Sequence, residues 1–484
     1  MQRSRRAPSS SKLSSLRLAG AGALGLMVVS SAACGGGVAP KADPSPGNQD
    51  SGPSPATTMP VETVDAGTSV PGHEAGTDSG APVDAASDGA NAAASSTYPA
   101  FKVDVASVVD NGGAVLAAPV IVTVTWSTDP DAPTWNAFDD TVGASSYWHA
   151  INSEYGVGEA TGGAANHVSI TTAPPTEFSD SDLDALVTAH AGVDWPAPTA
   201  NTIYTIYMPP GVGLYFGGSP SAGGQDACAE GVGGYHDETQ SKNLVYAILP
   251  HCSMFQAGDI ELSASHELNE AATDPHPETA LAYAGFDPNH LAFEFFNQFQ
   301  DELGDACESF VEATDDADFA PYSVQRQWSN ASAAAGSHWC LPALDEPFYN
   351  TTFLPKTALD TISVDLSALG AGATTTTSKG FKLAVNESRT FPIGLFSDRA
   401  TGAPFTLDVQ GLDQPIAQDQ NGNNINNGTA KVTLDLTSGV NGQIANVTVT
   451  PTAYSSLGIV FFYIRAVLPG STQHHYLPIL LSKS

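Results

Sequence analysis

The chain has 484 residues, which is too long for one simple domain and predicts two or three. It carries 17 Lys and Arg against 51 Asp and Glu, and five of the basic residues lie before position 18. The rest of the chain therefore offers no basic patch to phosphate, which argues against nucleic-acid binding and suits a soluble, exported protein that could hold cations.

Residues 1–34 have the organisation of a lipoprotein-type signal peptide. A basic segment precedes an apolar segment at 18–29, which is too short to span a bilayer comfortably. Residues 31–35 read Ser-Ala-Ala-Cys-Gly, which resembles a bacterial lipidation signal in which Cys34 becomes the lipid-bearing N-terminus. Ordinary signal cleavage nearby is the alternative. Residues 35–97 are rich in Pro, Ser, Ala and Asp with few large apolar side chains, so they predict a disordered tether.

Strands and helices alternate between residues 98 and 346. Runs rich in β-branched residues predict strands, and apolar residues at helical spacing behind a polar cap predict helices. Strands are expected at 120–126, 167–171, 201–207 and 244–249, and helices at 138–151 and from Ser179 onward. The Gly- and Ser-rich residues 211–234 predict a long loop. This alternation predicts an α/β domain with a mixed sheet.

A different pattern begins near residue 347 and continues to residue 484. Short apolar segments recur between clusters of Gly, Asn and Thr, without a helical period. They lie at 361–366, 380–385, 405–409, 430–436, 444–450, 459–467 and 475–481. The pattern predicts an all-β sandwich of immunoglobulin-like size, and it contains no catalytic cluster.

Four cysteines follow the signal-like segment. An even number of cysteines in an exported chain predicts two disulfides, and four cysteines allow three connectivities. Sequence order favours Cys228–Cys252 and Cys307–Cys340, because each pair closes a local loop.

Residues 263–275 read Ser-Ala-Ser-His-Glu-Leu-Asn-Glu-Ala-Ala-Thr-Asp-Pro and predict a helix. Asp259 is placed to cap its start, and the Asp-Pro pair at 274–275 ends it. One face of this helix carries an apolar stripe. The stripe consists of Ile260, Ala264, Leu268, Ala271 and Ala272.

A second face of this helix carries polar groups suited to metal binding. His266 and Glu270 are four residues apart, so they share this face, which the small Ser263 and Thr273 leave open. An imidazole and a carboxylate at this spacing can bind one metal ion, and Glu267 could take a proton from a metal-bound water. This is the His-Glu-x-x-His zinc helix with Glu in place of the second His, and it predicts a zincin-like domain. A plain ion pair on a solvated helix is the alternative.

A metal site needs a third ligand, and the acidic residues downstream supply candidates. Glu302 and Asp305 precede Cys307, whose disulfide would hold them rigidly. His276 lies at the offset of the third His in the long metzincin pattern, but Thr273 replaces the Gly that this pattern needs, so His276 is the weaker choice. His236 follows the Gly-rich segment and is a candidate substrate contact.

Four segments resemble a bacterial group of exported proteins that is itself similar to the plant exordium (phosphate-induced) family. They are residues 147–157, 265–275, 302–307 and 324–330. The family carries a His-Glu-Leu-Ala-Glu helix and later a Glu-x-Gly-Asp-x-Cys segment. The resemblance spans roughly residues 120–340 and implies a shared site at His266, Glu267, Glu270, Glu302 and Asp305. Residues 276–300 depart from the family by being longer and more aromatic.

These observations lead to one functional prediction with one alternative. The prediction is a surface-tethered hydrolase, most like a zinc peptidase, in which His266, Glu270 and either Glu302 or Asp305 bind Zn²⁺ or another divalent metal. Glu267 is the expected general base. The substrate would be an extracellular protein or peptide. The protein would be attached to the bacterial envelope by a lipid anchor, or it would be secreted. The alternative is a non-enzymatic surface protein with a structural metal, whose β domain binds envelope polysaccharide.

Overall fold

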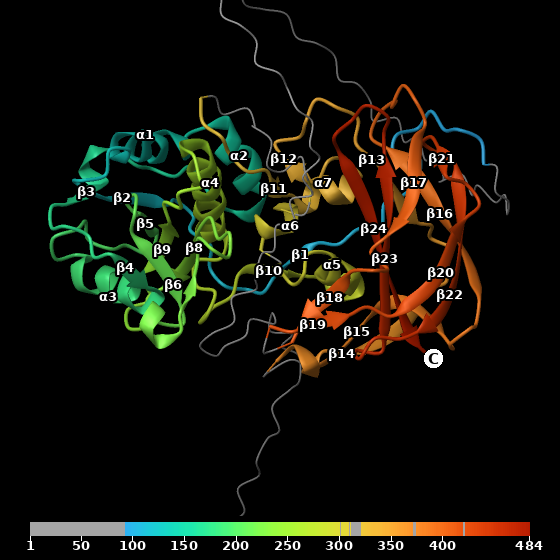
Figure 1. The fold of residues 1–484 in the computed structure, drawn as a ribbon. Coiled ribbons are helices and arrows are strands. Elements are labelled where there is room, and N and C mark those ends of the chain that lie inside the picture. Colours follow the sequence, from blue (N-terminus) through green and yellow to red (C-terminus); the bar gives the residue numbers. More distant parts are fainter. Residues whose placement is uncertain (1–91, 301, 309, 311–320, 371–373, 420–421) are drawn as a thin grey trace, which may run out of the picture. The chain divides into compact units, whose positions relative to one another are not determined.

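The structure is a computed structural model that describes residues 92–300, 302–308, 310, 321–370, 374–419 and 422–484 (Figure 1). The predicted signal peptide, Cys34 and most of the predicted tether lie outside the described residues. More of the described residues lie in strands than in helices, and the strands form several sheets. Within the described ranges, no helix combines the length and the apolar character needed to cross a membrane.

A five-stranded mixed sheet lies in the first half of the described chain, with the order β3-β2-β5-β9-β8 (Figure 1). β2, β3, β5 and β9 are parallel, whereas β8 pairs antiparallel with β9 at one edge. The strands span β2 Val120–Trp126, β3 His167–Ile170, β5 Thr202–Tyr207, β8 Tyr235–Glu238 and β9 Val245–Leu249. The four predicted strands are confirmed, and β8 is an additional edge strand that the sequence pattern does not predict.

Helices cover both faces of this sheet, which is why its central strands β2, β5 and β9 are buried at every residue except Val120. The four helices are α1 Ala132–Val142, α2 Ser146–Asn152, α3 Asp180–His190 and α4 Ala257–Thr273. α1, α2 and α4 share one apolar core with residues of the sheet, including Ile121, Ile203 and Leu249. α3 packs against the other face, where Leu183 and Val187 contact a second core. The sheet therefore fixes the position of α4 through its apolar stripe.

The single helix predicted at 138–151 is wrong, because the structure has two helices there. Gly143 follows α1, and a Cβ at this position would lie 2.3 Å from the carbonyl oxygen of Ala160, so the close approach of the two segments requires glycine. Ser145 then caps α2 by accepting a hydrogen bond from the amide of Trp148 at 3.0 Å. The helix predicted from Ser179 is confirmed as α3, which begins with a capping box between Ser179 and Asp182.

The Gly-rich residues 211–234 are more ordered than the predicted loop. They contribute β6 Gly213–Phe216 and β7 Gln225–Asp226 to a small sheet that also contains β4 Glu177–Ser179. Leu214 and Phe216 are buried in the same core as α3, and this apolar contact orders a segment that glycine alone would leave irregular.

Two sheets in the second half share one apolar core, which is the arrangement of a β-sandwich. The first sheet has the order β13-β16-β22-β20 and the second the order β14-β15-β24-β23-β17-β21. The strands are β13 Tyr349–Phe353, β14 Asp360–Asp365, β15 Thr375–Leu383, β16 Arg389–Ser397, β17 Phe405–Gln410, β20 Thr429–Leu434, β21 Ser438–Gly439, β22 Ile444–Ala453, β23 Ile459–Val467 and β24 His474–Lys483. All seven apolar segments of the sequence form strands, and β13, β16 and β21 are additional.

Short elements make up the rest of the described chain. Two-stranded sheets pair β1 with β10, β11 with β12, and β18 with β19. The elements are β1 Val108–Asp110, β10 Tyr283–Phe286, α5 Leu291–Phe296, α6 Asp305–Glu308, β11 Gln327–Trp328, α7 Asn330–Ala335, β12 Cys340–Leu341, β18 Pro415–Gln418 and β19 Asn424–Asn426. The disulfides Cys228–Cys252 and Cys307–Cys340 join residues 24 and 33 positions apart, and both predicted pairings are confirmed.

His290 is expected to make stability fall as pH rises above neutrality. Burial opposes its charge, but Asp104 and Asp287 raise its pKa to about 9 through contacts at 3.4 and 2.8 Å. A raised pKa stabilises the folded chain fully below the unfolded value near 6.5, and this stabilisation is lost as pH passes through about 9. We expect His290→Gln to remove about 2–3 kcal/mol at pH 6 and little at pH 10.

Urea denaturation of the wild type and His290→Gln at the two pH values tests this expectation. The difference between the two proteins cancels the contribution of titrating groups that do not interact with His290. Equal destabilisation at both pH values would contradict it.

Candidate metal centre

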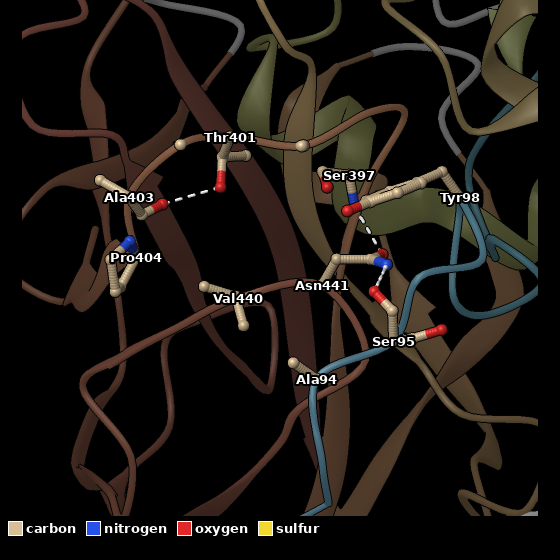
Figure 2. A pocket seen from close by; sticks show the side chains of 11 residues that line it. Ala94, Ser95, Tyr98, Ser397, Thr401, Ala403, Pro404, Val440 and Asn441 are labelled. Atoms are coloured by element: carbon tan, nitrogen blue, oxygen red, sulfur yellow. Dashed lines mark hydrogen bonds between the residues drawn. The ribbon is translucent and has the colours of Figure 1, made fainter.

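One surface pocket of the described chain is not a candidate catalytic site. It lies between the segment around Ser95 and loops of the β-sandwich, and Asn441 bridges the two by accepting a hydrogen bond from the Ser397 amide and donating one to the Ser95 carbonyl (Figure 2). Its lining contains small and polar residues but no Asp, Glu, His, Lys or Arg. Acid–base or metal chemistry must therefore be sought elsewhere.

Helix α4 presents the predicted metal-binding residues. Its N-cap is Gln256, and Asp259 is the third helical residue, whose carboxylate accepts a hydrogen bond from the Gln256 amide at 2.8 Å. The prediction that Asp259 itself is the cap is wrong by three positions, although its carboxylate still contributes to the capping box. The helix ends as predicted, with Asp274 at the C-cap before Pro275.

The face with His266 and Glu270 is covered, which corrects the expectation of an open face. His266 is 7% exposed, Glu267 5% and Glu270 2%, and Thr273 is buried beside them. A Cβ at Gly234 would lie 2.8 Å from Cγ of Glu267, so the chain before β8 passes directly over this face. These charged groups therefore lie in an environment where an unpaired charge is costly.

Glu270 and Asp305 both lie near Nε2 of His266. His266 Nε2 lies 3.0 Å from Glu270 Oε2 and 3.6 Å from Asp305 Oδ1. Glu308 faces the other ring nitrogen, with its Oε1 3.8 Å from His266 Nδ1. Of the two acids that the sequence offers as the third ligand, Asp305 lies beside His266.

Glu302 lies beside a second histidine instead. Its Oε1 is 3.9 Å from Nε2 of His236. The other nitrogen of His236, Nδ1, lies 3.6 Å from Glu267 Oε2 and 3.6 Å from Glu270 Oε2. Glu270 is therefore shared between the surroundings of His266 and those of His236.

Backbone groups of residues 302–308 hold this segment against α4. The amides of Gly304 and Asp305 both donate to Glu270 Oε1, at 3.0 and 3.1 Å. The Gln325 side chain donates to the Gly304 carbonyl at 2.9 Å, and the disulfide from Cys307 ties α6 to β12. A carboxylate that accepts two backbone amides has a fixed orientation, so its second oxygen stays directed into the cluster.

Seven titratable side chains meet in this cluster, and carboxyl groups outnumber imidazoles five to two. They are His236, His266, Glu267, Glu270, Glu302, Asp305 and Glu308. These side chains form three groups, and in each group the ligand atoms lie close enough to one another to hold a metal ion. Carboxylate oxygens and imidazole nitrogens are ligands of Zn²⁺ and of several other divalent metals.

The electrostatics of the cluster follow from this crowding. Burial opposes charge on His266, but Glu270 and Glu267 hold the pKa of its imidazole well above the usual value. Burial likewise disfavours the Glu270 carboxylate, yet His266 and His236 lower its pKa to about 2. Burial raises the pKa of Glu308 to about 7, against the attraction of His266. The charges that draw a proton to His266 would also draw a divalent cation.

The structure also places His276, His236 and Glu308 relative to the predicted metal ligands. His276 lies outside the three groups around α4, and its Nδ1 is 2.9 Å from Glu238 Oε2 in β8. His236 and Glu308 are members of the cluster that the ligand prediction omits. Two features of the sequence could have pointed to these residues. His236 directly follows the Gly-rich segment, and Glu308 is next to Cys307. Neither feature shows which side chains His236 and Glu308 contact in the folded chain.

Removing the Cys307–Cys340 disulfide should loosen the acidic segment. Replacing both cysteines by serine is expected to lower the free energy of unfolding by about 2–5 kcal/mol, because the bond restricts the unfolded chain by joining residues 33 positions apart. Because α6 carries Asp305, metal affinity should fall as well. The matched variant replaces Cys228 and Cys252, and it should lose similar stability with a smaller loss of metal affinity. Guanidinium denaturation and metal titration of the two variants measure both effects, and equal loss of affinity would contradict the role of α6.

Comparison with known proteins leaves the site to be judged on its own geometry. No family model and no curated protein matches the chain. Among solved structures, the chain is similar to the ASH/PapD-like domain 7 of human CEP192, over 30% of this chain and 96% of that chain, at 17% identity and a TM-score of 0.16. A TM-score this low carries no argument about fold or function.

Proposed function

We propose that this chain is a metal-dependent hydrolase of the zinc-peptidase kind, with Zn²⁺ or another divalent metal as cofactor. The observation that carries the proposal is the position of His266 Nε2, which lies 3.0 Å from Glu270 Oε2 and 3.6 Å from Asp305 Oδ1. His266 belongs to two groups that could hold a metal ion, one with Glu267 and Glu270 and one with Asp305 and Glu308. Under this proposal the five-stranded sheet with α4 is zincin-like, the two later sheets form an immunoglobulin-like sandwich, and the exordium-like segments share one site.

The residues present fit a metal ion. His266 Nδ1 is buried and has no hydrogen-bond partner among the described residues, and the carboxylate of Glu308 lies 3.8 Å from it. A Cβ at Gly304 would lie 2.7 Å from this atom and 2.8 Å from Glu270 Oε1, so glycine keeps the ligands free of steric contact. An imidazole with two carboxylates is a donor set that Zn²⁺ accepts.

The proposed mechanism assigns one role to each group. When bound, the metal would act as a Lewis acid that acidifies water and polarises the scissile carbonyl. Glu267 would accept the proton of the attacking water and deliver it to the leaving amine. His236 Nδ1 lies 3.6 Å from Glu267 Oε2 in the same cluster. His266, Glu270 and Asp305 would hold the cation, and the surrounding burial would exclude bulk water.

The proposed substrate is an extracellular protein or peptide. The two disulfides suggest an extracellular or periplasmic location. A lipid on Cys34 would add attachment to the cell envelope, and the acidic chain would repel anionic polymers rather than bind them.

One observation favours a second candidate function. Glu267 and Glu270 are only 5% and 2% exposed, which suits a metal that stabilises the fold as well as one that meets a substrate. Under this alternative the protein is a non-enzymatic surface protein, and its β-sandwich binds envelope polysaccharide.

Metal analysis of the purified full chain separates these functions. We expect bound divalent metal and cleavage of a peptide library by the wild type, with chelation and His266→Ala each removing both. Bound metal without cleavage of any peptide would favour the structural metal. A wild type with neither metal nor cleavage would contradict the hydrolase.

A further inference from the structure

Two of the three metal-competent groups around α4 share Glu270 but contain different histidines. One consists of His266, Glu267 and Glu270, and the other of His236, Glu270 and Glu302. His236 and His266 do not occur together in any group of mutually close ligand atoms among the described residues. A single ion with four to six ligands would not use all seven side chains of the cluster.

The hydrogen bonding of His236 is that of a metal ligand. Its Nε2 lies 3.2 Å from the carbonyl oxygen of Asp274, which can only accept, so Nε2 carries a proton and donates it. In the neutral ring, Nδ1 then directs a lone pair toward Glu267 Oε2 and Glu270 Oε2, both 3.6 Å away. A lone pair facing two carboxylates is repulsive unless the ring gains a second proton or a cation lies between them. Histidine ligands typically donate their other N–H to a backbone carbonyl, as His236 does.

The carboxylate of Glu270 lies between the two histidines. Its Oε2 is 3.0 Å from His266 Nε2 and 3.6 Å from His236 Nδ1. Its Oε1 is held by the amides of Gly304 and Asp305. The orientation is therefore set by the backbone, and the oxygen that remains is directed at both rings.

We propose that His236 and Glu302 bind a second divalent cation and that Glu270 bridges it to the cation held by His266. This inference rests on the proposed function, because it requires the His266 centre to bind metal. Glu302 completes the second centre, since His236, Glu270 and Glu302 each offer a ligand atom that lies within 4.8 Å of the other two. The side-chain exposures of His236 and Glu302 are 3% and 8%. Five carboxyl groups in one buried cluster carry enough negative charge for two divalent cations.

A pair of cations would change the chemistry of the site. In two-metal hydrolases the ions lie about 3.5–4 Å apart and stabilise both the attacking and the leaving oxygen or nitrogen. The carboxylate-rich His266 centre alone would be a weak Lewis acid, because its two anionic ligands reduce the positive charge of the metal. The second cation would compensate for that loss.

Metal stoichiometry of the full chain tests the inference. After loading with Mn²⁺, native mass spectrometry should show about two ions per chain in the wild type and about one in His236→Ala and in Glu302→Gln. Electron paramagnetic resonance should show a coupled pair in the wild type and an isolated ion in these variants. Glu302→Gln keeps the size of the side chain, so it gives a result even if His236→Ala fails to fold.

A separate group of Asp129, Asp131 and His251 supplies the control, because it too could hold a cation. His251→Ala should retain both ions and the coupled signal. Loss of the second ion in His251→Ala, or an uncoupled pair in the wild type, would overturn the inference. One ion in the wild type that persists in His236→Ala would also overturn it while leaving the proposed function intact. A wild type that binds no metal would contradict both the second cation and the proposed function.

Discussion

Glu267→Gln is expected to reduce turnover by about 10²–10⁴-fold and to leave the bound metal in place. Glutamine keeps the shape of the side chain but cannot take a proton from water. Metal should remain because the contacts of 3.0 and 3.6 Å that define the proposed centre join His266 to Glu270 and Asp305 and do not involve Glu267. Peptide cleavage and metal content, measured on the same preparation, give the two readouts.

Glu261→Gln provides the matched control for this variant. Glu261 lies on the same helix, is also buried at 7% exposure, and accepts a hydrogen bond from the Ser323 amide at 3.2 Å. It belongs to none of the metal-competent groups in the described chain. Its replacement should lower stability modestly and leave turnover unchanged. Full turnover in Glu267→Gln would exclude Glu267 as the base, and loss of metal would identify it as a ligand.

Much of the fold can be predicted because its signals are local. β2 and β23 match their predicted ranges at both ends, since β-branched and aromatic residues with period two or continuous burial leave few alternatives. β16 escapes prediction because Pro392 and Gly394 lie within it, and both residues weaken the strand pattern. Its place in the sheet depends on pairing with β13 and β22, which no local pattern contains.

The candidate site likewise has a part that local sequence patterns predict and a part that depends on tertiary structure. The spacing of His266 and Glu270 is a property of one helix, so the sequence is sufficient to pair them. The meeting of His236 with Glu270 requires β8 to pair with β9 and α4 to lie against that sheet. The burial of the face follows from two chain crossings, at Gly234 and Gly304, that only the tertiary structure shows. Sequence order still pairs the cysteines correctly, because each bond closes a short loop.

Gly304→Ala should disrupt the centre without removing any ligand. A Cβ at this position would lie 2.7 Å from His266 Nδ1 and 2.8 Å from both Glu270 Oε1 and Gln327 Oε1. These side chains are buried, so they cannot move into solvent to make room. Supporting residues around metal ligands typically contribute about 10–100-fold to metal affinity, and we expect a loss of at least that size. The inserted methyl group should also lower the free energy of unfolding by about 1–3 kcal/mol.

Gly258→Ala separates this steric effect from the general consequence of replacing glycine by alanine. Gly258 lies in the first turn of α4, and a Cβ there would meet the side-chain oxygen of Ser323 at 3.0 Å. That hydroxyl can rotate away, and alanine favours a helix over glycine by about 0.5–1 kcal/mol. Isothermal titration with Zn²⁺ and thermal denaturation of both variants should therefore show opposite outcomes. Unchanged affinity in Gly304→Ala would mean that His266 and Glu270 do not bind the metal together, because the methyl group would displace both side chains from the positions that the structure shows.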